Sequence, residues 1–217
     1  MMVPTKYLGT ASALLFSCSA AAVNCSSEQV PAVKLVQQQQ LTSQAMAGKP
    51  KMMGDARVQQ THLISVEGAE YIEQQIERQV PMGMGANGEM SFRWQSLTRK
   101  EWQVGDYHYT AAQQPRGDVY RKRRISPAHY NSAVAIAEPN ATAANTAQYL
   151  GFRCENSQQS LPDGGQVTVC NIRLYGRNIP LYALEKHPTL TRSVQPESLT
   201  QVCADRSVFA VPEYDWQ

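Results

Sequence analysis

The strongest constraint on the fold is a turn signal between two segments in which apolar and polar residues alternate. The turn lies at residues 161–165, with Pro162, Asp163 and Gly164 at its centre, and the alternating segments are residues 149–154 and 166–175. Alternation with a period of two is typical of a strand, and Pro-Asp-Gly is typical of a tight turn. We therefore expect a β-hairpin here.

The cysteines indicate an oxidising compartment. The chain has five of them: Cys18, Cys25, Cys154, Cys170 and Cys203. If Cys18 is lost or modified with an N-terminal leader, an even number remains for disulfides. Sequence leaves three pairings open, of which easy closure of a short loop favours Cys154–Cys170 or Cys170–Cys203, and a further alternative leaves Cys25 free in a tail. No cysteine lies at ligand spacing from a histidine, so we expect no metal site.

Residues 1–22 are typical of an export signal, with Lys6 before a short uncharged, mostly apolar run at residues 7–16 that cannot span a bilayer. Residues 15–18 resemble a bacterial lipobox, although Phe16 departs from that pattern, and this resemblance implies lipidation at Cys18. Simple cleavage after the alanines at 20–22 is the alternative. Ser19 after Cys18 resembles lipoproteins of the outer membrane. We therefore expect a protein of the outer membrane or the periplasm.

We divide the rest of the chain into a low-complexity tether, residues 23–60, and a single α+β domain, residues 61–217. The tether contains four successive glutamines and is expected to be disordered or extended. Apolar residues spaced by three and four positions predict one main helix over residues 63–79. From residue 89 the period changes to two and predicts a mostly antiparallel sheet, in which residues 102–104 begin a new strand that continues through residues 107–109. Disulfides are expected to staple the last third.

Charge and motifs exclude several classes of function. Charged residues make up 18% of the chain and the net charge is +2, which argues against a nucleic-acid partner. A G-x-G-x-x-G match at residues 83–88 leads into an expected strand rather than a helix, so we expect no dinucleotide cofactor. The densest charge run consists of Arg121, Lys122, Arg123 and Arg124. This run is a candidate interaction site for anionic lipid, glycan or an acidic partner surface.

No catalytic constellation is visible in the sequence. The four histidines are far apart along the chain, and neither H-E-x-x-H nor G-x-S-x-G occurs. Asp106 and His108 occupy alternate positions of one expected strand and would share a face. Such a pair could act as a general base, but a surface ion pair is the simpler interpretation.

Two short stretches resemble one known family. Residues 150–154 are similar to the end of formylglycine-generating, sulfatase-modifying-factor domains, which have a C-type-lectin-like fold. Glu101-Trp102 and Asp106-Tyr107 look like that family's E-W…D-x-Y stretch. The resemblance covers about 55 residues, lacks the family's R-G-G-S-W motif and its cysteine pair, and therefore implies no catalytic residue here.

Two hypotheses for the function follow from the sequence. The first is a non-enzymatic cell-envelope lipoprotein that docks onto other envelope proteins in a secretion, conjugation or surface assembly. The second is a periplasmic or surface enzyme or ligand-binding domain, with a fold like that of the family above. A deep pocket near Asp106 and His108 would favour the second hypothesis, and a flat apolar patch would favour the first.

Overall fold

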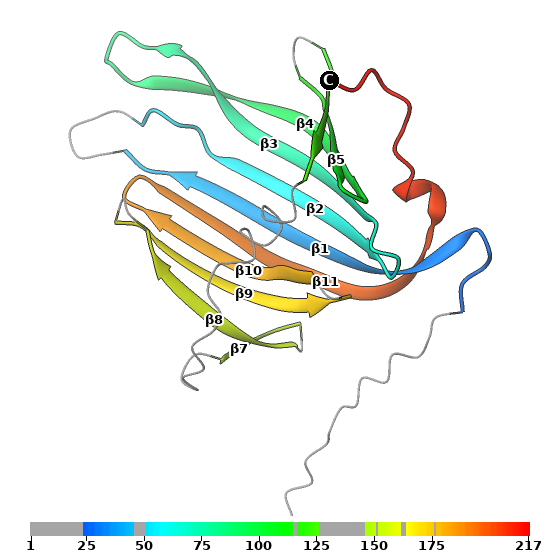
Figure 1. The fold of residues 1–217 in the computed structure, drawn as a ribbon. Coiled ribbons are helices and arrows are strands. Elements are labelled where there is room, and N and C mark those ends of the chain that lie inside the picture. Colours follow the sequence, from blue (N-terminus) through cyan, green and yellow to red (C-terminus); the bar gives the residue numbers. More distant parts are fainter. Residues whose placement is uncertain are drawn as a thin grey trace, which may run out of the picture.

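The protein is built from one long antiparallel β-sheet (Figure 1). The computed structural model describes residues 24–45, 51–114, 117–125, 146–150, 152–161, 164–175 and 177–217. The elements are β1 (Gln29–Ser43), β2 (Ala56–Ser65), β3 (Glu70–Met84), β4 (Met90–Val104), β5 (Tyr107–Ala112), β6 (Val119–Arg124), β7 (Thr146–Tyr149), β8 (Phe152–Ser160), β9 (Gln166–Leu174), β10 (Arg177–His187), β11 (Leu190–Asp205) and the short 3-10 helix η1 (Arg206–Phe209).

The first and last strands lie side by side in the middle of this sheet. The strand order is β6-β5-β4-β3-β2-β1-β11-β10-β9-β8-β7, so β1 and β11 join two meanders that extend to opposite edges (Figure 1). The disulfide between Cys25 and Cys203 closes this centre, with a Cα–Cα distance of 5.5 Å. Cys25 is therefore not free, and the expected Cys170–Cys203 pairing is wrong. Cys170 is itself disulfide-bonded, and the side chain of Cys154 lies outside the described residues.

The expected α+β fold is wrong, because the predicted helix over residues 63–79 is a β-hairpin. It consists of the end of β2, a turn in which Gly68 has a φ of 89°, and most of β3. Ile72, Ile76 and Val80 are four residues apart, a spacing that fits one face of a helix but also one face of a strand. Among the described residues, the helical structure is η1.

The expected disordered tether is also wrong, since most of it forms β1 and the start of β2. β1 is 15 residues long and pairs with β2 on one side and β11 on the other. Its apolar residues Val30, Val33 and Leu35 are buried, with Leu35 fully so. The composition of residues 23–60 predicted disorder wrongly, because the glutamines that follow Leu35 and Val36 are also part of strand β1.

Two of those four glutamines, Gln37 and Gln39, belong to a polar network, which we call the glutamine seam. The seam is made of Gln37, Gln39, Gln60 and Gln74. The side-chain amide of Gln60 donates to Gln37 Oε1 at 3.1 Å, and Gln60 Oε1 accepts from Gln39 at 2.9 Å and from Gln74 at 2.8 Å. A buried amide is costly unless it is hydrogen-bonded, and here each amide supplies a partner for another across β1, β2 and β3.

The seam reaches the other half of the sheet through Gln37. Its amide donates to the carbonyls of Pro180 at 2.8 Å and Leu181 at 3.2 Å, both on β10, which is separated from β1 by β11. In a flat sheet these strands would be about 10 Å apart, so the contact requires a strong bend. Bulges at Val36/Gln37 and Pro180/Tyr182 lie at this contact, and bulges bend and twist strands.

Two hydrophobic clusters complete the core. One joins Leu35 and Ile64 to residues of β9 and β10, among them Ile172, Ile179 and Leu181. The other lies on the opposite side of β1, where Val30, Ala32, Tyr71, Trp102, Ala204 and Phe209 pack together. The C-terminal segment after β11 covers this second cluster, and the Trp102 indole N–H donates to the Val208 carbonyl at 3.1 Å. The centre of the bent sheet is therefore well packed, and a meander of strands extends from it on each side.

The strand predictions for the remaining chain had mixed outcomes. The hairpin across residues 161–165 is confirmed, because β8 pairs with β9 around a turn in which the Leu161 N–H donates to the Gly165 carbonyl. The first strand of that hairpin was misplaced, however, because Tyr149 ends β7 and β8 pairs with β9 through residues 156–160. The prediction that residues 102–104 begin a new strand is wrong: they end β4, and Gly105, at a φ of 56°, turns the chain into β5. Glycine is favoured at such a positive φ.

Candidate ligand-binding groove

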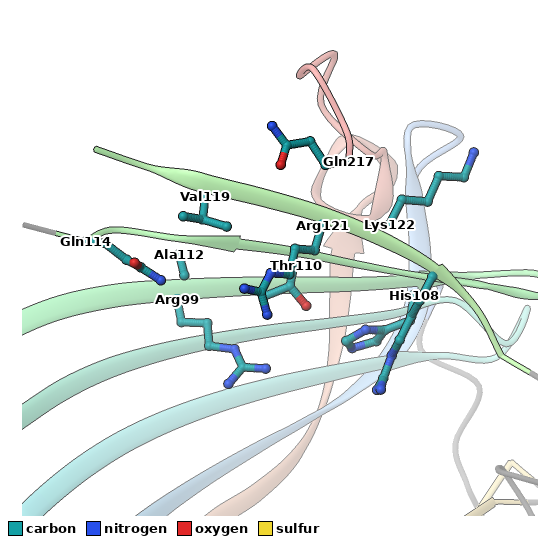
Figure 2. Close-up of a pocket in the computed structure, with 10 residues that line it drawn as sticks. Arg99, His108, Thr110, Ala112, Gln114, Val119, Arg121, Lys122 and Gln217 are labelled. Carbon is teal, nitrogen blue, oxygen red and sulfur yellow. The ribbon is translucent and has the colours of Figure 1, made fainter. Parts of the chain in front are cut away.

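A groove of about 520 Å³ lies on strands β4, β5 and β6, near one edge of the sheet (Figure 2). The residues that line it are Arg99, His108, Thr110, Ala112, Gln114, Val119, Arg121, Lys122, Arg123 and Gln217. Pocket volumes of roughly 300–1,000 Å³ are usual for sites that bind small ligands. We therefore treat this groove as the candidate functional site.

The pairing register explains why a groove forms here. Arg99 on β4 pairs with Ala112 on β5, which pairs with Val119 on β6. Two residues further along β5, Thr110 pairs with Arg121 on β6. Small side chains on β5 thus form a floor, and longer side chains from β4 and β6 form walls about 10 Å apart.

The walls of the groove are basic. Arg121 and Arg123 are exposed residues two apart on β6, and they share a face with Arg99 because alternate residues of a strand point to the same side. Among the described residues, none that lines the groove is acidic. In Figure 2, Arg99 and His108 point to one side of the sheet, and Lys122 points to the other. The Lys122 ammonium lies 4.4 Å from the centre of the Tyr107 ring, so its charge belongs to the opposite face.

Glu101, which is level with Thr110 on the same face of the sheet but is not a lining residue, holds two of these side chains in place. Its carboxylate lies 2.8 Å from His108 Nε2 and 2.7 Å from Arg99 Nε. The Arg99 Nε–H is not aligned for a hydrogen bond, so that contact is ionic. Burial by itself would raise the pKa of Glu101, but the hydrogen bond from His108 and the charges of Arg99, His108 and Arg123 together lower it. The carboxylate is therefore ionised at neutral pH and orients the cations around it.

The C-terminal segment closes the outer edge of the groove. The Lys122 N–H donates to the Gln217 carbonyl at 2.8 Å, and the Gln217 N–H donates to the Tyr120 carbonyl at 3.3 Å. Tyr120 stacks on Tyr214 with ring centres 4.1 Å apart, and Trp216 meets Tyr120 edge-on at 5.9 Å. Edge strands offer unpaired backbone groups to other chains, and the C-terminal segment occupies part of this edge.

The residues predicted from the sequence are only partly brought together. Within the basic run, Arg121 and Arg123 face the groove, whereas Lys122 lies against tyrosines on the other face. Arg124 lies 3.8 Å from Asp106, and both side chains are largely exposed. Asp106 and His108 do not form a pair, because Asp106 lies in the β4–β5 turn and His108 binds Glu101.

Sequence reasoning missed Arg99, Thr110 and Gln217. Residues 102–104 and 107–110 do alternate apolar and polar side chains, which is a signal for strands. The alignment of these strands with residues 119–123, however, depends on the pairing register. Gln217 reaches the groove through the aromatic contacts of the C-terminal segment, which no local pattern indicates. Cys18, the predicted lipidation site, lies outside the described residues.

No known family or relative guides the interpretation of this groove. No family model matches the sequence, and no curated protein matches it, so the resemblance of residues 101–107 and 150–154 to the sulfatase-modifying family has no further support. Across the described ranges, no group of three or more His, Cys, Asp or Glu side chains is placed to hold a metal ion. No helix in those ranges is long and apolar enough to cross a bilayer.

Proposed function

We propose that this protein is an exported, lipid-anchored docking component of the cell envelope, and that the groove binds an acidic segment of a partner protein. The observation that carries the proposal is the set of three arginines, Arg99, Arg121 and Arg123, around a floor of small side chains with no acidic lining residue among those described. Guanidinium groups bind carboxylates through paired hydrogen bonds. Aspartate and glutamate side chains of an extended segment fit this chemistry.

The disulfide is compatible with a lipid anchor at Cys18, which is itself part of the proposal. Lipidation at Cys18 would leave seven residues up to Cys25, which can span at most about 25 Å. Because Cys25 is bonded to Cys203, the sheet would then be held close to the membrane at the end where β1 begins and β11 ends. A protein held in this way is suited to recruiting a partner at the membrane surface.

The test is a crosslinked pull-down from envelope membranes with two matched variants. In the first, Arg99→Gln, Arg121→Gln and Arg123→Gln remove the arginines of the groove. In the control, Lys34→Gln, Arg78→Gln and Lys186→Gln remove the same charge at exposed positions on other strands. We expect the groove variant to lose one stoichiometric partner and the control to keep it. Equal recovery by both variants, or binding of the wild-type protein to anionic vesicles instead, would contradict the proposal.

A small anionic ligand is a second candidate, favoured by the volume of the groove. The Glu101–His108 pair gives less support to general-base catalysis, because a carboxylate with a lowered pKa is a weak base. Calorimetry with inorganic phosphate and with an aspartate- and glutamate-rich peptide separates the two candidates. The docking proposal predicts heat with the peptide and none with phosphate at physiological salt.

A further inference from the structure

The methionines have an unusual distribution. The chain has eight, of which Met1 and Met2 belong to the leader and Met46 lies outside the described residues. The other five are Met52, Met53, Met82, Met84 and Met90. Four of them are 55–59% exposed, and neither hydrophobic cluster of the described residues contains a methionine. Methionine usually fills gaps in cores, so this placement needs another explanation.

All five lie at one end of the sheet. Met82, Met84 and Met90 belong to the tip of the β3–β4 hairpin, and Met52 and Met53 follow the loop between β1 and β2 (Figure 1). The hairpin extends at the upper left of Figure 1, on the side where β1 ends and β2 begins. We call this set of five residues the methionine tip.

The hairpin register places two of its methionines directly opposite each other and a third close by. Met84 and Met90 are direct cross-strand partners, so their Cβ atoms are about 5 Å apart on the same face. Met82 lies in the bulge between Pro81 and Gly83, two residues from Met84. The turn closes with the Gly88 N–H donating to the Gly85 carbonyl. Flexible thioether side chains from these positions can converge on one point.

Residues 51–55, which lead into β2, are held against the same hairpin. The Lys51 ammonium lies 5.9 Å from the centre of the Phe92 ring, and Gly54 lies so close to Gln79 that a Cβ there would collide with the Gln79 carbonyl oxygen. Asp55 accepts hydrogen bonds from Lys51 at 2.8 Å and from the Ser43 N–H at 2.9 Å. The two methionines between Lys51 and Gly54 are therefore fixed beside the hairpin.

We propose that the methionine tip binds a soft monovalent cation, Cu(I). Thioether sulfur is a soft, uncharged ligand that selects Cu(I) over hard cations, and hard cations need oxygen ligands. The carboxylates near the tip already have partners. Asp55 forms an ion pair with Lys51, and Glu89 accepts a hydrogen bond from the Asn87 side-chain amide at 2.9 Å. No oxidation or reduction is part of the proposal, since the ion binds as Cu(I) and leaves as Cu(I).

Aromatic rings beside the tip add to the site. Phe92 and Trp94 follow Met90 at alternate positions of β4 and so share its face. Arg57 lies 5.5 Å from the centre of the Trp94 ring, so this ring already has one cation near it. Aromatic faces attract cations, and Trp94 gives a fluorescence signal for occupancy.

An exposed apolar tip could instead insert into a lipid surface, but the position of the methionine tip in the fold favours metal binding. The tip lies at the far end of β1 from Cys25, and a strand of 15 residues is about 50 Å long. A lipid anchor at Cys18 would therefore direct the tip away from the anchoring membrane. The metal proposal itself depends on neither the anchor nor the groove.

The test uses a substitution that removes sulfur but keeps apolarity. In the variant Met82→Leu, Met84→Leu, Met90→Leu, volume and hydrophobicity are nearly conserved, so binding to a lipid surface or an apolar partner would persist. The full-length processed protein, with any free thiols alkylated, is titrated anaerobically with Cu(I) against bicinchoninate. We expect one Cu(I) per wild-type chain and at least tenfold weaker binding by the variant. Equal affinity of the two proteins would overturn the proposal, as would no binding by the wild type.

A second measurement locates the ion. Ag(I), in chloride-free buffer, serves as a redox-inert substitute for Cu(I), and ¹³C-labelled methionine methyl groups report on each sulfur separately. We expect shifts of the methyl signals of Met82, Met84 and Met90 and quenching of Trp94 fluorescence. Shifts confined to Met46, the other methionine of the processed chain outside the tip, would place the ion elsewhere and contradict the proposal.

Discussion

Gln37 and Gln38 are adjacent residues of the same type, and the structure predicts opposite consequences of replacing them. Gln37 is 2% exposed and makes three hydrogen bonds, two as donor to the Pro180 and Leu181 carbonyls and one as acceptor from Gln60. Each hydrogen bond contributes about 1 kcal/mol net, and a buried group left without a partner costs about 1–3 kcal/mol. We expect Gln37→Ala to lower the free energy of unfolding by about 2–4 kcal/mol.

Gln38 points to the opposite face and is exposed. We expect Gln38→Ala to change the free energy of unfolding by less than about 0.5 kcal/mol, as is usual for surface substitutions. Urea unfolding followed by tryptophan fluorescence measures both variants, and a shift of the midpoint at constant slope identifies a change of stability. If the two variants have equal midpoints, residues 37–40 are not an internal strand and our explanation of the bend is wrong.

Three further predictions concern the disulfide, the groove and the anchor. The double variant Cys25→Ser, Cys203→Ser should lose up to about 5 kcal/mol of the free energy of unfolding in the chain-entropy model, because the disulfide spans 178 residues. Urea unfolding measures this loss, and a loss below about 1 kcal/mol would contradict the prediction. Glu101→Gln should lower the free energy of unfolding at pH 7, because folding lowers the pKa of Glu101. The difference in free energy of unfolding between this variant and the wild type should shrink as the pH falls below 4.5, the ordinary pKa of the carboxyl group. Unfolding curves at several pH values test this, and a difference that grows on acidification would refute it. Cys18→Ser should release the protein from membranes, and an intact mass without acyl chains on the wild-type protein would disprove lipidation.

The sequence predicted those parts of the fold that depend on local signals. The hairpin around residues 161–165 was predictable because a turn motif lies between two alternating segments. The strand pattern of Met90, Phe92 and Trp94 was predictable for the same reason. The helix prediction failed because isoleucines four residues apart fit both a helix and a strand, and nothing local distinguished the two.

Long-range contacts explain the rest. A run of glutamines cannot form a core alone, but Gln37 finds its partners on β2 and β10, at sequence separations of 23 and 143 residues. The groove has the same origin: the basic run of β6 was visible in the sequence, but the placement of Arg99 on the same face as Arg121, level with Ala112 and Val119, depends on the alignment of three strands. Strand register is set by such contacts between distant segments.

The most direct test of the docking function is site-specific photocrosslinking from the floor of the groove. A benzoyl-phenylalanine at Thr110 lies between the basic walls, and the same substitution at Thr200, an exposed threonine on β11, is the matched control. We predict that Thr110 yields one crosslinked envelope protein through a segment rich in aspartate and glutamate. We also predict that this product disappears when Arg99, Arg121 and Arg123 are replaced by glutamine. An equal yield from Thr200, or a product that survives loss of the arginines, would contradict the assignment of the groove as the docking site.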